Sequence, residues 1–420
     1  MTRFHFIHAA DIHLDSPLHG LARYEGLPAD EVRGATRAAF DNLIQRACDE
    51  AVDFMLIAGD LFDGDWKDMG TGLYFARAMA KLAAADIPAF LLAGNHDAAS
   101  VLTRQLPWPD NVRLFNTRRP QTHMLDHLGV AIHGQSFANA QVLDNLAAAY
   151  PAARENHFNI GMLHTALTGH EGHAPYAPCT IQDLTAKGYD YWALGHVHEH
   201  AVLGERPHII FPGNLQGRHI RETGPKGAVL VEVQDRTVVG FDHIPLDVVR
   251  WAQVEADCTG ARNLDDVNAA TRAALAHHHA QQSDGRAVIA RVTLTGRTAL
   301  AGLLRDRQTV QRDEVRALAA AIAPDLWIEK LRVTATPPDI PATEAATSDD
   351  FLALLAEAAA TPDLAEALSQ ELRPFLAAAA KALDEQGDGP AGLAARGDWT
   401  ALLSITGTAL NARLAGAETE

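Results

Sequence analysis

The chain has 420 residues, of which 47% are apolar and 21% are charged, and its formal net charge is −18. This length and composition are typical of a soluble protein with more than one domain, and no apolar stretch is long enough to span a bilayer. The three cysteines are widely spaced and form no CxxC pair, which argues against a disulfide framework and a thiolate metal site. We therefore expect a cytoplasmic protein without a membrane segment.

The negative charge is concentrated towards the C-terminus. Residues 337–420 hold 14 Asp and Glu against 4 Lys and Arg, a net charge of −10, which leaves −8 for residues 1–336. Affinity for DNA comes largely from Lys and Arg that neutralise phosphates. Metal ions at a carboxylate site would cancel part of the remaining charge. Charge alone therefore neither supports nor excludes DNA as a partner.

Residues 1–245 alternate short apolar runs with helical patterns, which predicts an α/β domain. Helices are expected at residues 30–50 and 71–85. The predicted strands are residues 4–10, 53–58, 89–93, 159–163 and 189–194, followed by 209–211, 228–233 and 238–244. This order indicates an α/β half followed by a half rich in strands.

Residues 246–336 have the pattern of a small βαβαβ module. Its strands are expected at residues 250–256, 287–294 and 326–335, and its helices at 264–280 and 309–322. A proline-rich segment at 336–341 then predicts a linker, because proline lacks a backbone donor and disfavours helix in the residue before it.

Residues 337–420 combine that linker with an Ala- and Leu-rich region that we expect to be helical at 349–360, 362–385 and 398–415. Apolar residues at spacings of three and four give this region an amphipathic face. The face either packs on the rest of the chain or docks a partner helix or coiled coil.

Five short polar clusters each follow one of the predicted strands. They are Asp11-Ile12-His13, Gly59-Asp60-Leu61-Phe62-Asp63, Gly94-Asn95-His96-Asp97, His164 and Gly195-His196-Val197-His198. In open α/β sheets, ligands gather beyond the carboxyl ends of the strands. Residues two apart project to the same side of a strand, so Asp11 and His13 can reach one ion.

These residue types fit two divalent metals that share Asp60. The first would be bound by Asp11, His13, Asp60 and His198, and the second by Asp60, Asn95, His164 and His196. Mixed nitrogen and oxygen ligands suit Mn, Fe, Zn or Co better than Ca. Two such metals can activate a bridging hydroxide for the hydrolysis of a phosphate ester.

His96 lies beside the expected ligand Asn95 but is not needed as a ligand. It is free to protonate the leaving alkoxide or to stabilise charge on the phosphoryl group. A nearby carboxylate, either Asp63 or Asp97, would hold its tautomer and raise its basicity.

The five clusters in this order resemble the calcineurin-like metallophosphoesterase superfamily. The segments 8–15 and 59–63 are similar to its DNA-repair exonuclease branch of SbcD-type and YhaO-like proteins, and segment 211–227 is similar to the YhaO-like ones. The resemblance covers about residues 3–245 firmly, residues 246–336 loosely as a cap domain, and the tail hardly at all. It implies an αββα sandwich of two mixed sheets, a small α+β cap, manganese as the metal, and exonuclease hydrolysis of DNA.

The resemblance also implies partners. Such nucleases work with an SMC-like ABC-type ATPase with long coiled coils, which docks on helices C-terminal to the cap, and residues 337–420 could serve that purpose. Helices of the catalytic domain form a homodimer in such nucleases, and residues 30–50 are the nearest candidate here. The analogy favours Asp63 as the partner of His96. Gly64 stands where protein phosphatases of the superfamily typically have Arg, which argues against a phosphoprotein substrate.

Arg218, Arg221 and Lys226 follow the last cluster and could neutralise DNA phosphates, or could pair with acids such as Glu222. Two other functions stay open. A small-molecule phosphodiesterase would need neither the module nor the tail. A non-enzymatic scaffold would not need every ligand position to be filled.

Overall fold

The computed structural model describes residues 2–16, 34–64, 69–99, 108–167 and 176–338, and the short stretches 369–372, 376, 390–399, 401–403 and 405–407. By its contacts the chain divides into two units. One comprises Met1–Gln253, His279–Ala290 and Asp325–Glu329, and the other comprises Val254–His278, Arg291–Pro324 and Lys330–Glu420. The predicted domain boundaries at 245/246 and 336/337 stay predictions.

The first sheet of the larger unit has six strands. Their order is β12 (Thr237–Pro245), β11 (Gly227–Gln234), β1 (Arg3–Ala9), β2 (Phe54–Ala58), β3 (Ala89–Leu92) and β4 (Val112–Leu114). Strands β1 to β4 run parallel to one another, whereas β11 is antiparallel to both β1 and β12. The sheet is therefore mixed, as predicted.

The second sheet also has six strands and the same mixture of directions. Their order is β5 (Gln121–Leu125), β6 (Val130–Gly134), β7 (Phe158–His164), β8 (Tyr191–Gly195), β10 (His208–Phe211) and β9 (Ala201–Glu205). Strands β6, β7, β8 and β10 are parallel, and β5 and β9 pair antiparallel at the two edges. The sequence predicted only β7, β8 and β10 of this sheet.

A core of aromatic and aliphatic side chains lies between the two sheets. Phe4 and Phe6 of β1 point into it and meet Phe158 and Tyr191 from the second sheet, with ring centroids 5.7 and 5.2 Å apart. The next residue along the strand, Ile7, belongs to the core on the opposite face of β1. Side chains alternate along a strand in this way, so each sheet has two apolar faces to cover.

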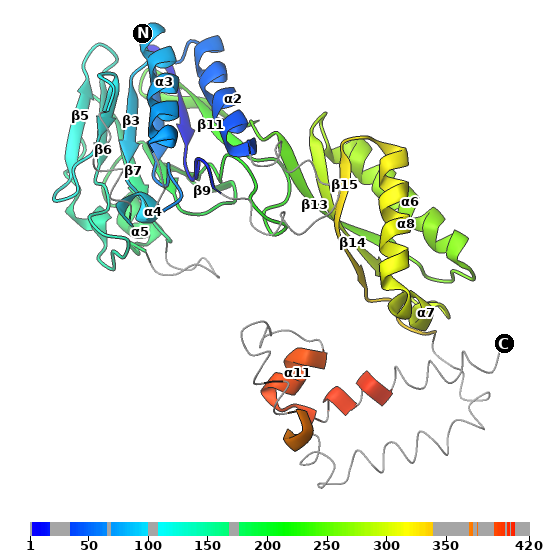
Figure 1. Ribbon diagram of the computed structural model, residues 1–420. Coiled ribbons are helices and arrows are strands. Elements are labelled where there is room, and N and C mark those ends of the chain that lie inside the picture. The colour runs from blue at the N-terminus through cyan, green and yellow to red at the C-terminus, as the bar shows by residue number, and fades with distance from the viewer. Residues whose placement is uncertain are drawn as a thin grey trace, which may run out of the picture. The chain divides into compact units, whose positions relative to one another are not determined.

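Helices α2 (Ala35–Asp49) and α3 (Gly70–Ala84) cover the outer face of the first sheet, where Phe40 and Phe75 pack at 5.9 Å (Figure 1). The outer face of the second sheet, around Trp192, is covered by a short 3-10 helix (Leu146–Ala149) and by α5 (Ile181–Thr185). Four layers result, and the predicted αββα sandwich of two mixed sheets is confirmed. The helix predicted at 30–50 begins at Ala35, after its N-cap Gly34, and ends at Asp49, while residues 17–33 lie outside the described part.

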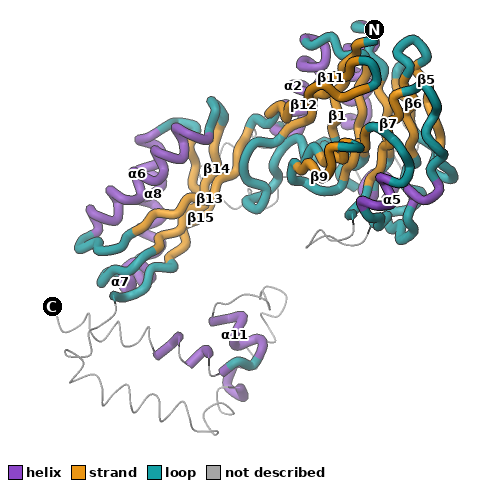
Figure 2. The backbone as a smooth tube through the Cα atoms, turned by 180° about the vertical axis from the view of Figure 1, so that it is seen from behind, coloured by secondary structure: helices purple, strands orange, loops and turns teal. Residues whose placement is uncertain are grey.

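A third sheet has three strands, in the order β13 (Val249–Asp257), β14 (Ala287–Thr295) and β15 (Leu326–Val333). Helices α6 (Leu264–Gln282) and α8 (Gln308–Ile322) lie side by side on one face of it (Figures 1 and 2). The βαβαβ order is the predicted one, with a short additional helix, α7 (Ala301–Asp306), before α8. The two contact units divide this sheet within its strands.

Near the C-terminus, α11 (Pro390–Arg396) and residues 369–372, 401–403 and 405–407 are helical. The helix predicted at 349–360 lies outside the described residues, as does most of the one predicted at 362–385. Among the described residues, no helix is long and apolar enough to cross a membrane.

Candidate metal centre

The five polar clusters meet at one edge of the sandwich. Asp11 and His13 follow β1, Asp60 follows β2, and the first residue of α4 (Asn95–Ala99) comes soon after β3. His164 ends β7, and His196 and His198 follow β8. Since β1, β2 and β3 belong to one sheet and β7 and β8 to the other, both sheets contribute side chains. All seven predicted ligands are therefore brought to the same place.

The first group is Asp11, His13 and His198, whose ligand-type atoms lie within 4.8 Å of one another. Nε2 of His13 is 3.2 Å from Nε2 of His198 and 3.9 Å from Oδ2 of Asp60. Nε2 of His198 is 3.9 Å from Oδ1 of Asp11. Together with Asp60, this group makes up the four residues that the sequence assigned to one ion.

The second group is Asp60, His164 and His196, which meet the same 4.8 Å limit. Nε2 of His164 lies 3.0 Å from Oδ1 of Asn95 and 3.4 Å from Oδ2 of Asp60. Nδ1 of His164 lies 2.9 Å from the backbone oxygen of Ala58, which leaves Nε2 as the atom that faces the other ligands. Asp60 thus adjoins both groups, as a shared ligand must.

The donor set fits divalent cations. Within the described part of the chain, Oδ1 of Asp11 is buried and has no hydrogen-bond partner. Burial raises the pKa of Asp11, because a carboxylate loses solvation there. Two imidazole nitrogens facing each other, as in His13 and His198, also suit a cation between them. Burial lowers the pKa of His13 to about 4, so its ring is neutral and can donate a lone pair.

The pKa values of Asp60 and His164 are linked. Burial alone would raise the pKa of Asp60, but the neighbouring His164 and then His13 hold it below its usual range. Burial alone would lower the pKa of His164, but the charge of Asp60 and the contact with it raise that pKa to about 9. The carboxylate of Asp60 is therefore ionised across the neutral pH range and is ready to bind cations.

The backbone at the centre is strained. Asp11, His13 and Asp60 have φ angles of 50°, 45° and 50°, and His196 has a φ of 103°. Such left-handed conformations cost about 1–3 kcal/mol each for residues other than glycine, and they cluster at functional sites. Hydrogen bonds of 3.0 Å from Asp11 N to Gly59 O and from His13 N to Asp60 O hold the first two turns.

Two glycines of the motifs make room for the ligands. A Cβ atom on Gly94 would lie 2.3 Å from Oδ1 of Asp60. One on Gly195 would lie 2.1 Å from the backbone oxygen of Ala58 and 3.0 Å from Nδ1 of His164. Both positions therefore require glycine because of the close approach of neighbouring groups.

His96 lies beside the centre, with its Nδ1 3.1 Å from Oδ1 of Asp63. This contact is the main cause that raises the pKa of His96. Asp97 instead accepts hydrogen bonds from the backbone N–H groups of Leu61, Phe62 and Gly94. The structure thus places Asp63, and not Asp97, against His96.

Asp63 also holds other groups of the site. Its carboxylate accepts a hydrogen bond of 2.8 Å from Oγ of Ser16, and it lies 3.4 Å from Nδ1 of His13. Burial would raise the pKa of Asp63, but hydrogen bonds from His13 and His96 keep it well below its usual range. Asp63 is therefore ionised and can orient both imidazoles.

The three candidate substrate cations differ in position. Nη1 of Arg218 lies 3.4 Å from Oδ1 of Asp63 and 3.3 Å from Oγ of Ser16, at the margin of the centre. Arg221 is exposed. Lys226 is buried, and its Nζ donates to the backbone oxygen of His198 at 2.8 Å. This contact fits a role in supporting His198 better than contact with substrate.

Sequence reasoning missed the partner of His198. Glu222 is buried, and its Oε1 lies 2.7 Å from Nδ1 of His198. The sequence suggested Glu222 only as an ion-pair partner for nearby cations. Its place in the polar segment after the last cluster was the available signal.

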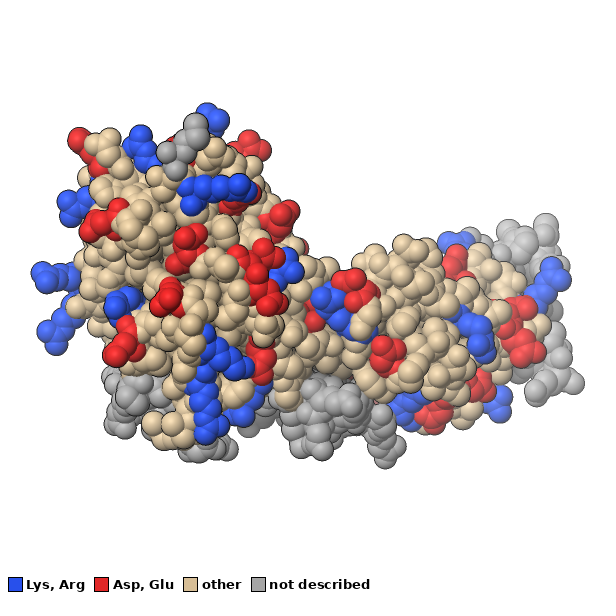
Figure 3. All heavy atoms as spheres, turned by 90° about the horizontal axis from the view of Figure 1, so that it is seen from above, with Lys and Arg blue, Asp and Glu red and all other residues tan. Residues whose placement is uncertain are grey.

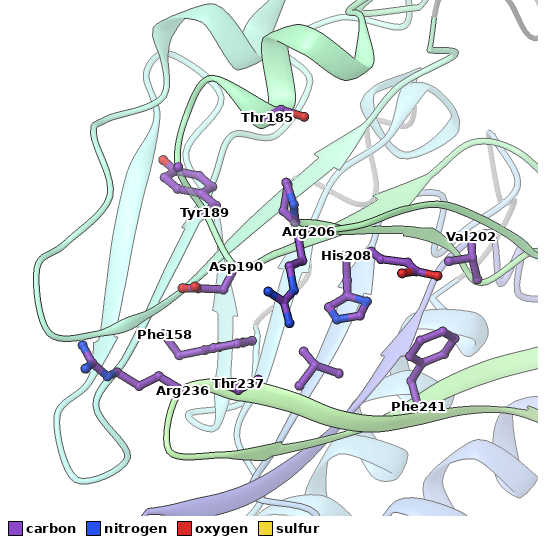
Figure 4. Close-up of a pocket in the computed structure, with 14 residues that line it drawn as sticks. Phe158, Thr185, Tyr189, Asp190, Val202, Arg206, His208, Arg236, Thr237 and Phe241 are labelled. Carbon is purple, nitrogen blue, oxygen red and sulfur yellow. The ribbon is translucent and has the colours of Figure 1, made fainter.

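A pocket of about 730 Å³ lies apart from the metal centre, beside the turns that precede β8 and β10 (Figure 4). Its lining includes Tyr189, Asp190, Arg206, His208 and Phe241, and none of the predicted ligands. On the face shown in Figure 3, basic and acidic side chains are interspersed. The candidate centre is recognised by its ligands.

Comparison with known proteins adds family information. Residues 4–200 match the calcineurin-like phosphoesterase family, and residues 251–336 match the middle domain of the metallophosphoesterase YhaO. The chain is 38% identical over 268 residues to the uncharacterised metallophosphoesterase YhaO of Bacillus subtilis (strain 168). That match covers 63% of this chain and 65% of the relative, so the chain spans somewhat less than two thirds of that protein.

Among solved structures, TT1561 of Thermus thermophilus and a dimetal phosphatase from Danio rerio are each 11% identical to this chain. Each match covers 58% of this chain, and 100% and 98% of the two structures, with TM-scores of 0.32 and 0.33. These likenesses are too weak to carry an argument about function.

Proposed function

We propose that this chain is a metal-dependent phosphoesterase that hydrolyses the phosphodiester bonds of DNA, because residues 4–200 match the calcineurin-like phosphoesterase family. The observation that supports the proposal best is the convergence of seven ligand-type side chains from five strand ends of two sheets. His96 and Asp63 beside them add a proton donor that a hydrolase of this kind needs.

Two divalent cations, which we propose to be Mn²⁺, would supply Lewis-acid chemistry at this site, activating a water and neutralising charge on the phosphoryl group. The residues that would hold the first are Asp11, His13, Asp60 and His198, and those that would hold the second are Asp60, Asn95, His164 and His196. The strained turns after β1 and β2 keep the ligands in place before substrate arrives. Such preorganisation lowers the cost of binding and of reaction.

His96 would protonate the leaving alkoxide. Its Nδ1 is held by Asp63, so its Nε2 is the nitrogen left for a substrate oxygen. Its side chain is 39% exposed, in contrast to the fully buried His13 and His164. The contact with Asp63 raises the pKa of His96, which favours the protonated imidazole that a general acid requires.

Features next to the centre support a diester of DNA as the substrate. Position 64 is glycine, whereas phosphoprotein phosphatases of the superfamily typically have arginine there, which argues against a phosphoprotein substrate. Arg218 places a guanidinium within hydrogen-bond distance of Asp63, where it can approach a phosphate. Because the relative YhaO is itself uncharacterised, the proposal of DNA as the substrate is based on these residues and on the resemblance to DNA-repair exonucleases.

We further propose an SMC-like ABC-type ATPase as a partner that docks on residues 337–420. The support for it is the predicted amphipathic face of that region. A homodimer through helix α2 is the corresponding proposal for self-association, by the same resemblance.

The test is Mn²⁺-dependent release of nucleotides from end-labelled single- and double-stranded DNA. The wild-type chain is compared with His96→Ala, and with His127→Ala as a control that removes an exposed histidine in the turn between β5 and β6. We expect cleavage by the wild type and by His127→Ala, and a loss of about 100-fold or more in His96→Ala.

The other outcomes identify the alternatives. Hydrolysis of bis-p-nitrophenyl phosphate that depends on His96, without DNA cleavage, would indicate a small-molecule phosphodiesterase or a requirement for the ATPase. Metal binding without hydrolysis of either substrate would indicate a scaffold.

A further inference from the structure

His198 is held at its ring and at its backbone by one segment, residues 214–226. Nδ1 of the ring lies 2.7 Å from Oε1 of Glu222. The backbone oxygen of His198 accepts hydrogen bonds from Nζ of Lys226 at 2.8 Å and from the N–H of Asn214 at 3.5 Å. The orientation of the imidazole therefore depends on this segment.

Glu222 is itself fixed. Its second oxygen, Oε2, accepts hydrogen bonds from Nδ2 of Asn214 at 2.9 Å and from the backbone N–H of Arg218 at 2.6 Å. The residue is only 7% exposed. A buried carboxylate with both oxygens engaged has no freedom to turn away from the ring.

The contact with Glu222 decides which nitrogen of His198 is offered to a cation. A carboxylate beside Nδ1 accepts its proton in a hydrogen bond, so the lone pair is on Nε2. Nε2 is the atom that lies 3.2 Å from Nε2 of His13 and 3.9 Å from Oδ1 of Asp11. Carboxylate partners of this kind orient metal-binding histidines, and their loss typically weakens metal affinity about 10- to 100-fold.

The second group of ligands has a different support. Nδ1 of His164 faces the backbone oxygen of Ala58, at 2.9 Å, and not a side chain of segment 214–226. A change at Glu222 should therefore affect the two candidate sites unequally.

Segment 214–226 is also tied to the start of β13. Oε1 of Gln216 accepts from the N–H of Val248 at 2.9 Å, and its Nε2 donates to the oxygen of Val249 at 2.6 Å. The indole N–H of Trp251 donates to the oxygen of Gly217 at 2.9 Å. These bonds fix the segment to the start of β13.

We propose that Glu222 is a positioning residue, which holds His198 so that its Nε2 completes the cation site of Asp11 and His13. The proposal rests on the proposed function only in taking this cluster as a metal centre, and it does not depend on DNA as the substrate. The removal of the Glu222 charge should weaken one metal site and spare the other.

The experiment is calorimetric titration of the chelator-treated full chain with Mn²⁺, together with the electron paramagnetic resonance spectrum of the loaded protein. The variants are Glu222→Gln and Glu222→Asp, which keeps the charge but shortens the reach. Glu199→Gln is the matched control, because Glu199 is an exposed acid next to His198 in the chain. Circular dichroism and thermal unfolding verify that each variant is folded.

We expect the wild type and Glu199→Gln to bind two Mn²⁺ ions as a magnetically coupled pair. In Glu222→Gln one ion should bind about 10- to 100-fold more weakly, and the six-line signal of an isolated Mn²⁺ should appear. Glu222→Asp should weaken the same Mn²⁺ ion by a smaller factor than Glu222→Gln does. It provides the test if Glu222→Gln does not fold. Two unchanged Mn²⁺ affinities in a folded Glu222 variant would overturn the proposal.

The outcome can be separated from that of the proposed function. If the wild type binds two ions and Glu222→Gln binds one of them more weakly but neither protein cleaves DNA, the positioning role stands, and either the substrate is wrong or cleavage requires the ATPase. If the wild type binds no Mn²⁺, both proposals are wrong.

Discussion

The replacement of Gly195 by alanine should disable the centre without changing a ligand. The added Cβ would lie 2.1 Å from the backbone oxygen of Ala58, and contacts under 3.0 Å are essentially never found. Strands β2 and β8 must therefore separate by about 1 Å at their carboxyl ends. That displacement would break the 2.9 Å contact between His164 and Ala58 and move His164 away from Asp60.

A misplacement of about 1 Å in a catalytic group costs roughly 100-fold in rate, and overpacking of this kind costs about 1–3 kcal/mol of stability. We expect Gly195→Ala to be folded, to melt several degrees lower, and to hydrolyse bis-p-nitrophenyl phosphate about 100-fold more slowly with Mn²⁺. Gly240→Ala is the control, since a Cβ there meets nothing within 4 Å. A Gly195→Ala variant with wild-type rate and melting temperature would refute this reasoning.

Three further predictions concern protons and metal. Asp63→Asn should lower the pKa of His96, because Asp63 raises it. A general acid works only while it is protonated, so the alkaline limb of the profile of kcat against pH should move to lower pH. An unmoved limb would contradict the assignment of His96 as the general acid. Burial lowers the pKa of His8 to about 3 in the folded chain. As pH falls below 6.5, the unfolded chain therefore binds a proton at His8 before the folded chain does, and the free energy of unfolding declines, by roughly 3 kcal/mol at pH 4.5. His8→Gln should lose less stability than the wild type in urea titrations with chelator at pH 7 and 4.5, and equal losses would speak against it. Mn²⁺ at about a hundred times its Kd should raise the free energy of unfolding by about 2.7 kcal/mol per site, and a melting temperature that does not respond would count against a metal centre.

The strands that carry the centre could be predicted because they are buried on both faces. Strand β2, Phe54–Ala58, is apolar at every position, and turn-forming residues bound it on both sides. Such apolar runs can be recognised as strands without knowledge of the strands that pair with them. Since the ligands follow these runs directly, the convergence at one sheet edge could be predicted as well.

The edges of the second sheet could not be predicted in this way. Strands β5 and β9 are half exposed along their length, so no apolar run marks them. Their pairing is decided by the neighbouring strands β6 and β10, which supply the backbone partners. Strand formation at an edge depends on such context more than on local sequence.

The partners of the ligands were also outside the reach of sequence. Glu222 is 24 residues from His198, and their contact depends on how segment 214–226 folds back over the centre. The resemblance favoured Asp63 over Asp97 as the partner of His96, but the residues alone left the choice open, because it depends on the path of the turn after β2. Asp97 is used by three backbone N–H groups, which no spacing rule reveals.

The most direct test of a metal-dependent phosphoesterase is a Mn²⁺ titration of bis-p-nitrophenyl phosphate hydrolysis by the chelator-treated chain. Asp60→Asn removes the carboxylate that adjoins both groups of ligands, and Asp242→Asn, at an exposed position of β12, is the control. We predict hydrolysis that rises with Mn²⁺ and saturates in the wild type and in Asp242→Asn, with a loss of about 100-fold or more in Asp60→Asn. Hydrolysis that is independent of Mn²⁺, or that is unchanged in Asp60→Asn, would contradict the account.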